Sequence, residues 1–281
     1  MGKVKISVVV CVKNEEARLE ECLKRIKLNK PDEIIVVDGN STDKTAEIAQ
    51  KYTDKVIIMK NSNLTRDRQI GLNAAQNEYI AMIDGDHRLK KGDLDSLLGD
   101  LLDNQFSIVQ AQLKSYRNNN WLNKGEEQMW DMNHNIPGPK SMIGVAPAMY
   151  RKSLFEKIQF DDTITKTIDD TDFIYRLSRL PNIKYGIGNT KIAQFHTSDY
   201  KDYMKKFKWY GIGDGEFCMK HKNRALSMWF HLLVRYPVLY PLRAALSGRL
   251  YAAGYCFLQG IVRAKWMIIT CVMRKNQLKK R

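Results

Sequence analysis

The chain has 281 residues, of which 44% are hydrophobic, so it can bury a substantial core and does not have the composition of a disordered protein. Its net charge of +15 is uneven, because residues 201–281 hold 17 lysines and arginines against three acids and carry +14. No acidic residue follows Glu216. This asymmetry indicates an anionic partner: acidic lipid, nucleic acid or a phosphorylated substrate.

The five cysteines form no C-x-x-C pair and show no metal-site spacing. An odd number without such spacing indicates reduced thiols in the cytosol. The first seven residues contain no apolar signal-peptide core, so we expect the N-terminal portion to stay in the compartment where it was made.

Short β-branched runs alternate with helical patterns over the first 113 residues. We expect strands at 6–12, 32–38, 55–59, 78–84 and 106–113, and helices at 14–26, 41–52, 64–76 and 94–103. Asn14 is the expected cap of the first helix. The alternation predicts βαβ crossovers and an α/β fold with a largely parallel, doubly wound sheet.

The pattern is less regular after residue 113. Helices are expected at 121–135 and 168–180, with a Pro- and Gly-rich loop leading to a strand at 136–150. Residues 200–217 read as a helix that ends in a glycine turn.

Acidic residues follow two of the predicted strands. Asp38 ends the second strand, and Asp84 and Asp86 follow the fourth. In a doubly wound sheet, ligands bind beyond the carboxyl ends of the strands, so we expect these carboxylates to face one crevice. An Asp-x-Asp triplet supplies hard oxygen ligands for Mg²⁺ or Mn²⁺, although Asp-Gly after a strand is also an ordinary turn signal.

Four segments in order, SVVVCVKNEE, EIIVVDGNSTDKT, RQIGLNAAQNEYIAMIDGD and IDDTDFIYRL, give a more specific signal than any one of them. Together they resemble the family 2 glycosyltransferases of GT-A fold, a Rossmann-like mixed sheet, over about the first 215 residues. The resemblance implies inverting transfer of a sugar from a nucleotide-diphosphate donor, most often a UDP-sugar in this family, to a hydroxyl acceptor. It also implies Mn²⁺ or Mg²⁺ as cofactor.

The resemblance assigns roles by position. Asp38, Lys13 and Glu15 would contact the base or ribose of the donor, although Asp38 could also be a turn residue. Asp84 would lie at the ribose or the metal, and Asp86 would bind the metal directly.

Two further roles follow from less exact motif matches. Arg68 falls near the family's ARNxG segment, here RDRQIG with Gln69 in place of Asn, where it would contact the donor or be a surface arginine. Asp170 in IDDTD is the candidate general base, with Asp169 in place of the family's Glu. Its acidic neighbours Asp169 and Asp172 could raise its proton affinity, or the acids could simply suit a helix N-terminus.

The resemblance also extends to three residues beyond residue 195. His196 would reach the metal or the diphosphate, although a lone histidine is often structural. Lys206 precedes WYGIG, which resembles an aromatic and glycine segment of polysaccharide-building members. Lys206 would bind diphosphate and Trp209 would stack on acceptor sugar or lipid, and the alternative is a solvated basic helix face.

Residues 227–281 contain no uncharged apolar run of 18, and the longest, 250–262, has 13. Aromatic and basic residues among Leu, Ile and Met are typical of an interfacial helix. We therefore expect a catalytic domain at 1–215 and a basic amphipathic tail at 216–281. The tail would attach peripherally or monotopically to the anionic cytoplasmic face of the cell membrane, with a re-entrant hairpin or packing in an oligomer as alternatives.

These observations favour a glycosyltransferase that acts on a lipid-linked or polysaccharide acceptor at the membrane. The alternative is a non-catalytic protein that binds nucleotide sugar, or an anionic polymer through its basic tail. We expect no nucleic-acid partner, because the tail is strongly apolar between its charges.

Overall fold

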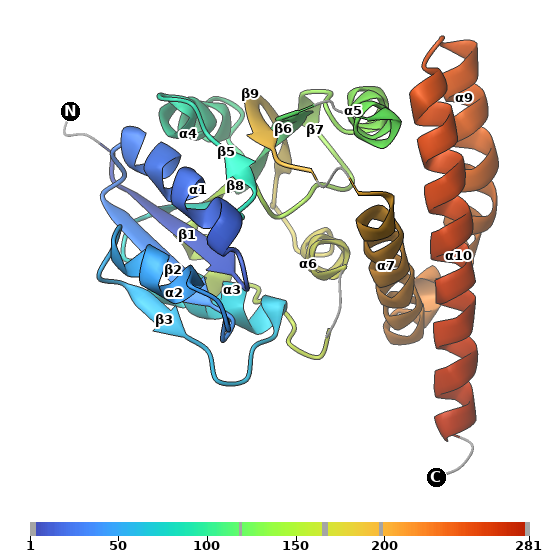
Figure 1. Ribbon diagram of the computed structural model, residues 1–281, viewed down its shortest axis with the longest axis horizontal. Coiled ribbons are helices and arrows are strands. Elements are labelled where there is room, and N and C mark those ends of the chain that lie inside the picture. The colour runs from blue at the N-terminus through green and yellow to red at the C-terminus, as the bar shows by residue number, and fades with distance from the viewer. Residues whose placement is uncertain (1–3, 118–119, 165–167, 197–198, 279–281) are drawn as a thin grey trace. The chain divides into compact units, whose positions relative to one another are not determined.

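The computed structural model describes residues 4–117, 120–164, 168–196 and 199–278, with side chains to residue 273 (Figure 1). Its contacts divide the chain into two compact units. Unit 1 consists of Met1–Tyr116, Asn135–Thr163 and Asp170–Phe195, and unit 2 of Arg117–His134, Ile164–Asp169 and His196–Arg281.

Unit 1 is built on a mixed β-sheet with the strand order β3-β2-β1-β4-β8-β6-β9-β5, in which β7 also pairs with β9. The strands β1 to β4 are parallel, and β8 runs antiparallel to both β4 and β6. The strands are β1 (Ile6–Val12), β2 (Glu33–Asp38), β3 (Val56–Ile58), β4 (Tyr79–Met82), β5 (His87–Arg88), β6 (Ile108–Ser115), β7 (Gly138–Pro139), β8 (Ala148–Arg151) and β9 (Tyr185–Gln194).

Helices cover both faces of this sheet, which explains the unbroken apolar runs of the central strands. Val8 and Val10 of β1 belong to a core with α1 (Glu16–Leu28) and α4 (Asp93–Asp103). Val9 and Cys11 point into a second core with α3 (Leu64–Ala74) and α6 (Asp169–Leu177). The short helix α2 is Thr45–Gln50. The predicted doubly wound α/β sheet is therefore confirmed.

The predicted cap of the first helix is wrong. Asn14 has a positive φ of 53°, and helix α1 begins at Glu16 without a side-chain cap. The side-chain oxygen of Asn14 instead accepts a hydrogen bond from the Thr42 backbone N–H at 2.9 Å. Asn14 tolerates this left-handed conformation, and its side chain joins the loops that follow β1 and β2.

Unit 2 is helical. Its described elements are α5 (Trp121–Asn133), α7 (Tyr200–Lys220), the short η2 (Lys222–Arg224), α8 (Ala225–Phe230), the π-helix η3 (His231–Leu239), α9 (Tyr240–Leu246) and the long α10 (Leu250–Leu278). The long helix α10 packs against α5, α7, η3 and α9. The predicted boundary between residues 215 and 216 falls inside α7. The assignment of catalysis to 1–215 and of lipid contact to 216–281 stays a prediction.

The glycine turn predicted near residue 213 is wrong, because α7 continues as one helix to Lys220. Glycine is needed there for close packing rather than for a turn. A Cβ on Gly211 would lie 2.5 Å from the Arg263 carbonyl oxygen, and one on Gly215 would lie 2.8 Å from Cβ of Thr270. Packing against α10 thus overrides the low helix propensity of glycine.

Among the described residues, the stretch Leu250–Met273 of α10 is long and apolar enough to cross a membrane, by length and composition alone. Core helices of soluble proteins also meet this criterion. All five cysteines are free thiols.

Candidate active site

The carboxyl ends of three neighbouring strands bring the predicted acids together in unit 1. Strand β1 lies between β2 and β4, and Asp38 at the end of β2 pairs in register with Val12 of β1. On the other side, Asp84 follows β4 by two residues. The chain builds β2 and β3 on one side of β1 and then places β4 on the other, so these acids flank the switch point where such sheets bind ligands.

The segment Asp84–Gly85–Asp86 is a tight turn into strand β5. The backbone N–H of His87 donates to the Asp84 carbonyl oxygen at 3.0 Å. A Cβ on Gly85 would lie 3.1 Å from Cγ1 of Val12, so glycine lets this turn pack closely on the end of β1.

Asp84 is held by a buried cation. One terminal nitrogen of Arg68, on α3, lies 3.3 Å from each carboxylate oxygen of Asp84, and the arginine side chain is only 7% exposed. Burial lowers the pKa of Arg68, but the charges of Asp84, Cys11, Tyr150 and Asp170 together outweigh this effect, and the pKa is raised overall. Arg68 is therefore not a surface arginine.

Asp86 has one oxygen bonded to the protein and one that is not. Its Oδ2 accepts a hydrogen bond from Nε2 of Gln194 on β9 at 2.9 Å. Its Oδ1 is buried and accepts no hydrogen bond from the described residues. A buried carboxylate oxygen without a donor requires a compensating partner, and a hard divalent cation would supply one.

His87 is a residue of this site that the sequence analysis missed. The potential ligand atoms of Asp84, Asp86 and His87 lie within 4.8 Å of one another. However, Nδ1 of His87 accepts the Asp84 backbone N–H at 2.9 Å, so the proton of the neutral ring is on Nε2. That nitrogen lies 3.8 Å from Asp86 Oδ1, which is too far for a hydrogen bond, and because it carries the proton it is not a metal ligand in this tautomer. The signal was the histidine directly after Asp-Gly-Asp.

The first loop of the sheet brings Glu15 within electrostatic range of the Asp84–Asp86 turn. Its carboxylate accepts two hydrogen bonds from Arg18, at 2.7 and 2.8 Å. Burial raises the pKa of Glu15, Arg18 opposes this rise, and the charges of Asp86 and Asp84 add to it. Lys13 in the same loop is exposed. Both residues lie in the loop that follows β1, and their contact with the donor stays a prediction.

Asp38 is almost fully buried and stabilises the turn after β2. Its Oδ1 accepts hydrogen bonds from both the backbone N–H and the hydroxyl of Ser41. The turn role considered for Asp38 is therefore present, and its contact with a donor stays a prediction.

Asp67 is a second buried acid near these loops that the sequence did not single out. Its Oδ2 accepts a hydrogen bond from the Ser62 hydroxyl at 2.7 Å, and burial raises its pKa. A Cβ on Gly39 would lie 3.3 Å from the same oxygen, so Gly39 allows the two loops to approach.

Asp170, the predicted base, lies in the first turn of α6 and is half-buried. Its Oδ1 accepts the backbone N–H of Thr171 at 2.6 Å. Asp170 and Asp84 act electrostatically on the same two groups, Tyr150 and Arg68. Burial raises the pKa of Tyr150, the charge of Arg68 opposes this rise, and the charges of Asp84 and Asp170 add to it. Asp170 likewise contributes to the raised pKa of Arg68.

Asp172 does not act on Asp170 as an isolated charge. Its Oδ2 accepts a hydrogen bond from Nε of Arg176 at 2.8 Å, which compensates its negative charge. The effect of Asp172 on the proton affinity of Asp170 stays a prediction.

His196 and Lys206 lie in unit 2, where both meet the buried Glu126 of α5. Nδ1 of His196 is 3.2 Å from one oxygen of Glu126, and Nζ of Lys206 is 2.9 Å from the other. The hydroxyl of Tyr203 donates to Glu126 at 2.9 Å. Burial would raise the pKa of Glu126, but Lys206 and His196 outweigh burial and lower it to about 2.

Within unit 2, therefore, Lys206 balances an internal carboxylate, and it is not part of a solvated basic face. The roles predicted for His196 at a metal and for Lys206 at a diphosphate stay predictions. Trp209 is 39% exposed and stacks on Tyr210, with ring centroids 6.0 Å apart, so its ring is accessible to a ligand.

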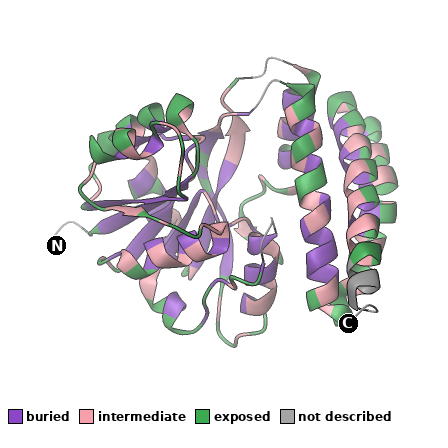
Figure 2. Cartoon of the chain, turned by 60° about the horizontal axis from the view of Figure 1, so that its bottom comes forward, coloured by how far each residue is buried: buried purple, intermediate pink, exposed green. Residues whose placement is uncertain are grey.

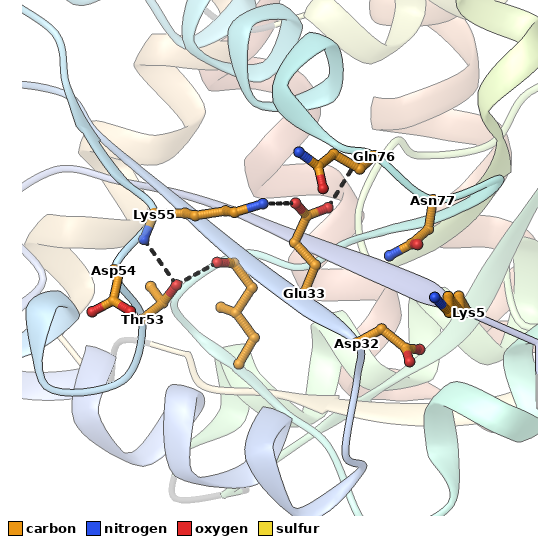
Figure 3. Close-up of a pocket in the computed structure, with 9 residues that line it drawn as sticks. Lys5, Asp32, Glu33, Thr53, Asp54, Lys55, Gln76 and Asn77 are labelled. Atoms are coloured by element: carbon orange, nitrogen blue, oxygen red, sulfur yellow. Dashed lines mark hydrogen bonds and ion pairs between the residues drawn. The ribbon is translucent and has the colours of Figure 1, made fainter.

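A cavity of about 340 Å³ lies at the opposite, amino-terminal edge of β2 (Figure 3). It is lined by polar residues that include Lys5, Asp32, Glu33 and Lys55. Glu33 is paired with Lys55 and accepts the Gln76 backbone N–H at 2.9 Å, so this acid is satisfied within the protein. No residue of the predicted site lines this cavity.

The sequence model of glycosyl transferase family 2 matches residues 7–182, which include the strand-end acids and Asp170. The chain belongs to this family. The sheet of unit 1 is accordingly the GT-A sheet that the sequence predicted.

Relatives agree with this assignment. A cholesterol galactosyltransferase of Borreliella burgdorferi is 33% identical over 121 residues, which are 41% of this chain and 34% of that protein. An uncharacterized glycosyltransferase of Rickettsia typhi is 27% identical over 222 residues, 73% of this chain and 70% of that protein. The chain thus matches only about a third of the length of the first of these relatives.

Solved structures share the fold. S. aureus TarS 1-349 has a TM-score of 0.57 at 16% identity, covering 99% of this chain and 92% of that one. Glucosyl-3-phosphoglycerate synthase from Mycobacterium tuberculosis, solved with Mg²⁺ and UDP, has a TM-score of 0.51 at 18% identity, covering 71% and 74%.

Proposed function

We propose that this enzyme transfers a sugar, with inversion, from a UDP-sugar to a hydroxyl of a lipid-linked or polysaccharide acceptor at the cytoplasmic face of the membrane. The observation that carries the proposal is the shared position of Asp84 and Asp170 around the buried Arg68. Both acids act electrostatically on Arg68, which supports a shared site for a metal-binding acid and a base. TarS has been solved with UDP and with UDP-GlcNAc, which supports a uridine nucleotide donor.

The Asp84–Asp86 turn fits a divalent ion. Asp86 would bind Mn²⁺ or Mg²⁺ through the buried Oδ1, Asp84 would complete the acidic side, and Gln194 would hold Asp86 in place. When bound, the ion neutralises charge on the donor diphosphate. The M. tuberculosis synthase, solved with Mg²⁺ or Mn²⁺ and uridine nucleotides, supports this cofactor.

The chemical step requires a base and a position for the acceptor. Asp170 would accept the proton of the acceptor hydroxyl as its oxygen bonds to the anomeric carbon. The bond from that carbon to the diphosphate oxygen breaks on the opposite face, which inverts the configuration and releases UDP. Lys13, Glu15 and Asp38 would bind the base and ribose, Arg68 would orient Asp84, and Trp209 would stack on the acceptor.

The acceptor class rests on unit 2. Its helices expose many apolar side chains, and their surroundings are basic. A lipid-linked acceptor would be reached by an enzyme attached to the bilayer. The name of the Borreliella relative, a cholesterol galactosyltransferase, supports a lipid substrate.

The test is a donor screen. Purified protein is incubated with Mn²⁺ or Mg²⁺ and a panel of nucleotide sugars, and release of nucleoside diphosphate is measured. We expect slow metal-dependent release from one UDP-sugar, reduced on the order of 100-fold or more by Asp170→Asn. Binding of the nucleotide sugar without release would indicate a non-catalytic binding protein, and unchanged release by Asp170→Asn would remove Asp170 as the base.

A further inference from the structure

A groove of about 320 Å³ lies between the first half of α7 and the middle of α10, both in unit 2. Three lysines line it, Lys201, Lys205 and Lys208, together with the apolar side chains of Met204, Val262 and Trp266. We call it the α7–α10 groove. Its combination of clustered positive charge and apolar wall is typical of a site for an anionic amphiphile.

The three lysines lie on one face of α7, because they are spaced by four and then three residues. Nζ of Lys208 lies 4.0 Å from the ring centroid of Trp266, which orients this ammonium group over the apolar wall. Lys205 pairs with Asp202 at 2.8 Å, but this pair is exposed and contributes little. Lys201 has no acidic partner in the part of the chain that the structure describes.

Exposed residues, green in Figure 2, occur on the helices of unit 2, and on α10 they recur along the helix. One set of them follows a spacing of three and four residues, as expected for one face of a helix. Its members are Leu250, Gly254, Phe257, Ile261, Lys265, Ile268 and Val272. We call this face the α10 stripe. Phe257 and Ile261 are 54% and 50% exposed, although both are large apolar residues.

Charge decides which partner fits this surface. A second copy of the chain would bring basic residues against basic residues, because no acid follows Glu216 in the sequence. Nucleic acid would supply phosphates but no apolar layer for Phe257 and Ile261. A bilayer with anionic lipid supplies both, with phosphates at the depth of the lysines and acyl chains beside the stripe.

We propose that the α7–α10 groove binds the phosphate of an anionic membrane lipid while the α10 stripe contacts the acyl chains. This inference deepens the proposed function, since it rests on attachment of the enzyme to the membrane. It assigns lipid contact to Lys201, Lys205 and Lys208 at the start of α7, outside the tail at 216–281 to which the sequence assigned it. Under this proposal, binding of the anionic lipid depends on these particular lysines rather than on the net charge of the protein.

Flotation with vesicles tests the groove. Full-length protein is mixed with vesicles of phosphatidylcholine alone or with 30 mol% phosphatidylglycerol, a composition of roughly the anionic content of a charged membrane surface. The double variant Lys201→Gln/Lys208→Gln is compared with Lys51→Gln/Lys157→Gln, which removes the same charge from two exposed lysines of unit 1. We expect the groove variant to bind on the order of tenfold more weakly to anionic vesicles and the control less than about twofold. Equal losses of vesicle binding in both variants would overturn the proposed role of the groove in lipid binding.

Soluble probes separate lipid from free phosphate. Short-chain dihexanoyl phosphatidylglycerol should bind saturably and change the tryptophan fluorescence of the unaltered protein. This fluorescence change should be smaller in the Trp266→Phe variant. The groove variant should bind it on the order of tenfold more weakly. Equal binding of inorganic phosphate at the same concentration would show a phosphate site without lipid recognition and would overturn the inference.

The stripe is tested with Phe257→Ser/Ile261→Ser. We expect weaker flotation and an unchanged elution volume in size-exclusion chromatography without lipid. A dimeric protein that this variant converts to a monomer would show that the stripe is a subunit interface. Release of nucleoside diphosphate by the unaltered protein in solution reports separately on the proposed function, so catalysis and lipid binding can fail independently.

Discussion

Arg68 and Asp84 form a pair in which one nitrogen of the buried arginine lies 3.3 Å from both oxygens of the half-buried carboxylate. The pair joins helix α3 to the turn after β4. It fixes the direction of Asp84 and compensates its charge in a place of low solvent access. Arg68 therefore holds the acidic turn in place as well as contributing a positive charge to the proposed donor site.

Replacing Arg68 by lysine should keep the charge and lose this geometry, because the flexible lysine stem does not hold its nitrogen in the fixed position of the guanidinium nitrogen. Loss of one charged hydrogen bond costs about 2 kcal/mol, which lowers donor turnover on the order of thirty-fold. Arg66→Lys is the matched control, since Arg66 lies on the same helix in an exposed pair with Asp162 at 2.9 Å. Equal turnover of the two variants would contradict a role for the Arg68 geometry.

Asp86→Asn should separate metal binding from stability. The substitution removes a carboxylate oxygen that no described group satisfies, so we expect unfolding by urea to be unchanged or slightly harder. Binding of Mn²⁺, measured by electron paramagnetic resonance, should weaken on the order of tenfold or more. Asp103→Asn, at the end of α4, is the control. A destabilised Asp86→Asn with normal Mn²⁺ binding would instead indicate a structural acid.

Gly211→Ala should destabilise unit 2, because its Cβ would approach the Arg263 carbonyl oxygen to 2.5 Å. Overpacking of this kind costs about 1–3 kcal/mol in the free energy of unfolding. Gly99→Ala on α4 is the control, since its Cβ would meet nothing within 4 Å. There the higher helix propensity of alanine should stabilise by about 0.5–1 kcal/mol. The two variants should move the unfolding midpoint in opposite directions.

The sheet and its acidic edge could be predicted from sequence because their determinants are local. β-Branched runs such as 6–12 indicate strands buried on both faces, and Asp38 and Asp84 follow such runs directly. The direction of parallel strands then requires that both acids reach one edge. The pairing of Asp84 with Arg68 was not predictable, because it depends on how α3 packs on the sheet.

The polar network of unit 2 shows why other features escaped prediction. Glu126 and His196 are 70 positions apart, and nothing in the sequence around Glu126 indicates a buried acid. Lys206 looked like one of several lysines on a basic helix, but its position on α7 points it at Glu126. In the same way, the glycines at 211–215 suggested a turn from propensity alone, whereas contact with α10 requires them inside a helix.

Arg263 of α10 and Asp214 of α7 form two hydrogen bonds of 2.8 Å each, and Asp214 is fully buried. Removing one partner, as in Arg263→Met, leaves an uncompensated buried charge and should cost about 3–5 kcal/mol in the free energy of unfolding. The double variant Arg263→Met/Asp214→Leu should recover much of that loss. Chemical denaturation of both variants checks this expectation. The pairwise account would be contradicted if the double variant lost more free energy of unfolding than Arg263→Met and Asp214→Leu lose together.

His231, on η3, gives unit 2 a predictable response to acid. Burial lowers its pKa most, and together with the nearby positive groups Arg263, Arg235 and His134 it brings the pKa from 6.5 to about 3. Below pH 6.5, His231 is therefore protonated in the unfolded chain but stays neutral in the folded protein. The free energy of unfolding consequently falls as the pH falls from 6.5 towards 3.

We expect about 3 kcal/mol of unfolding free energy to be lost through this group between pH 6.5 and pH 4. His231→Phe keeps an aromatic ring beside Tyr236 and Tyr240 but cannot titrate. Urea unfolding at several pH values should therefore show a shallower decline for His231→Phe than for the unaltered protein. Parallel curves would mean that His231 is already protonated in the fold, or that other groups govern the acid response.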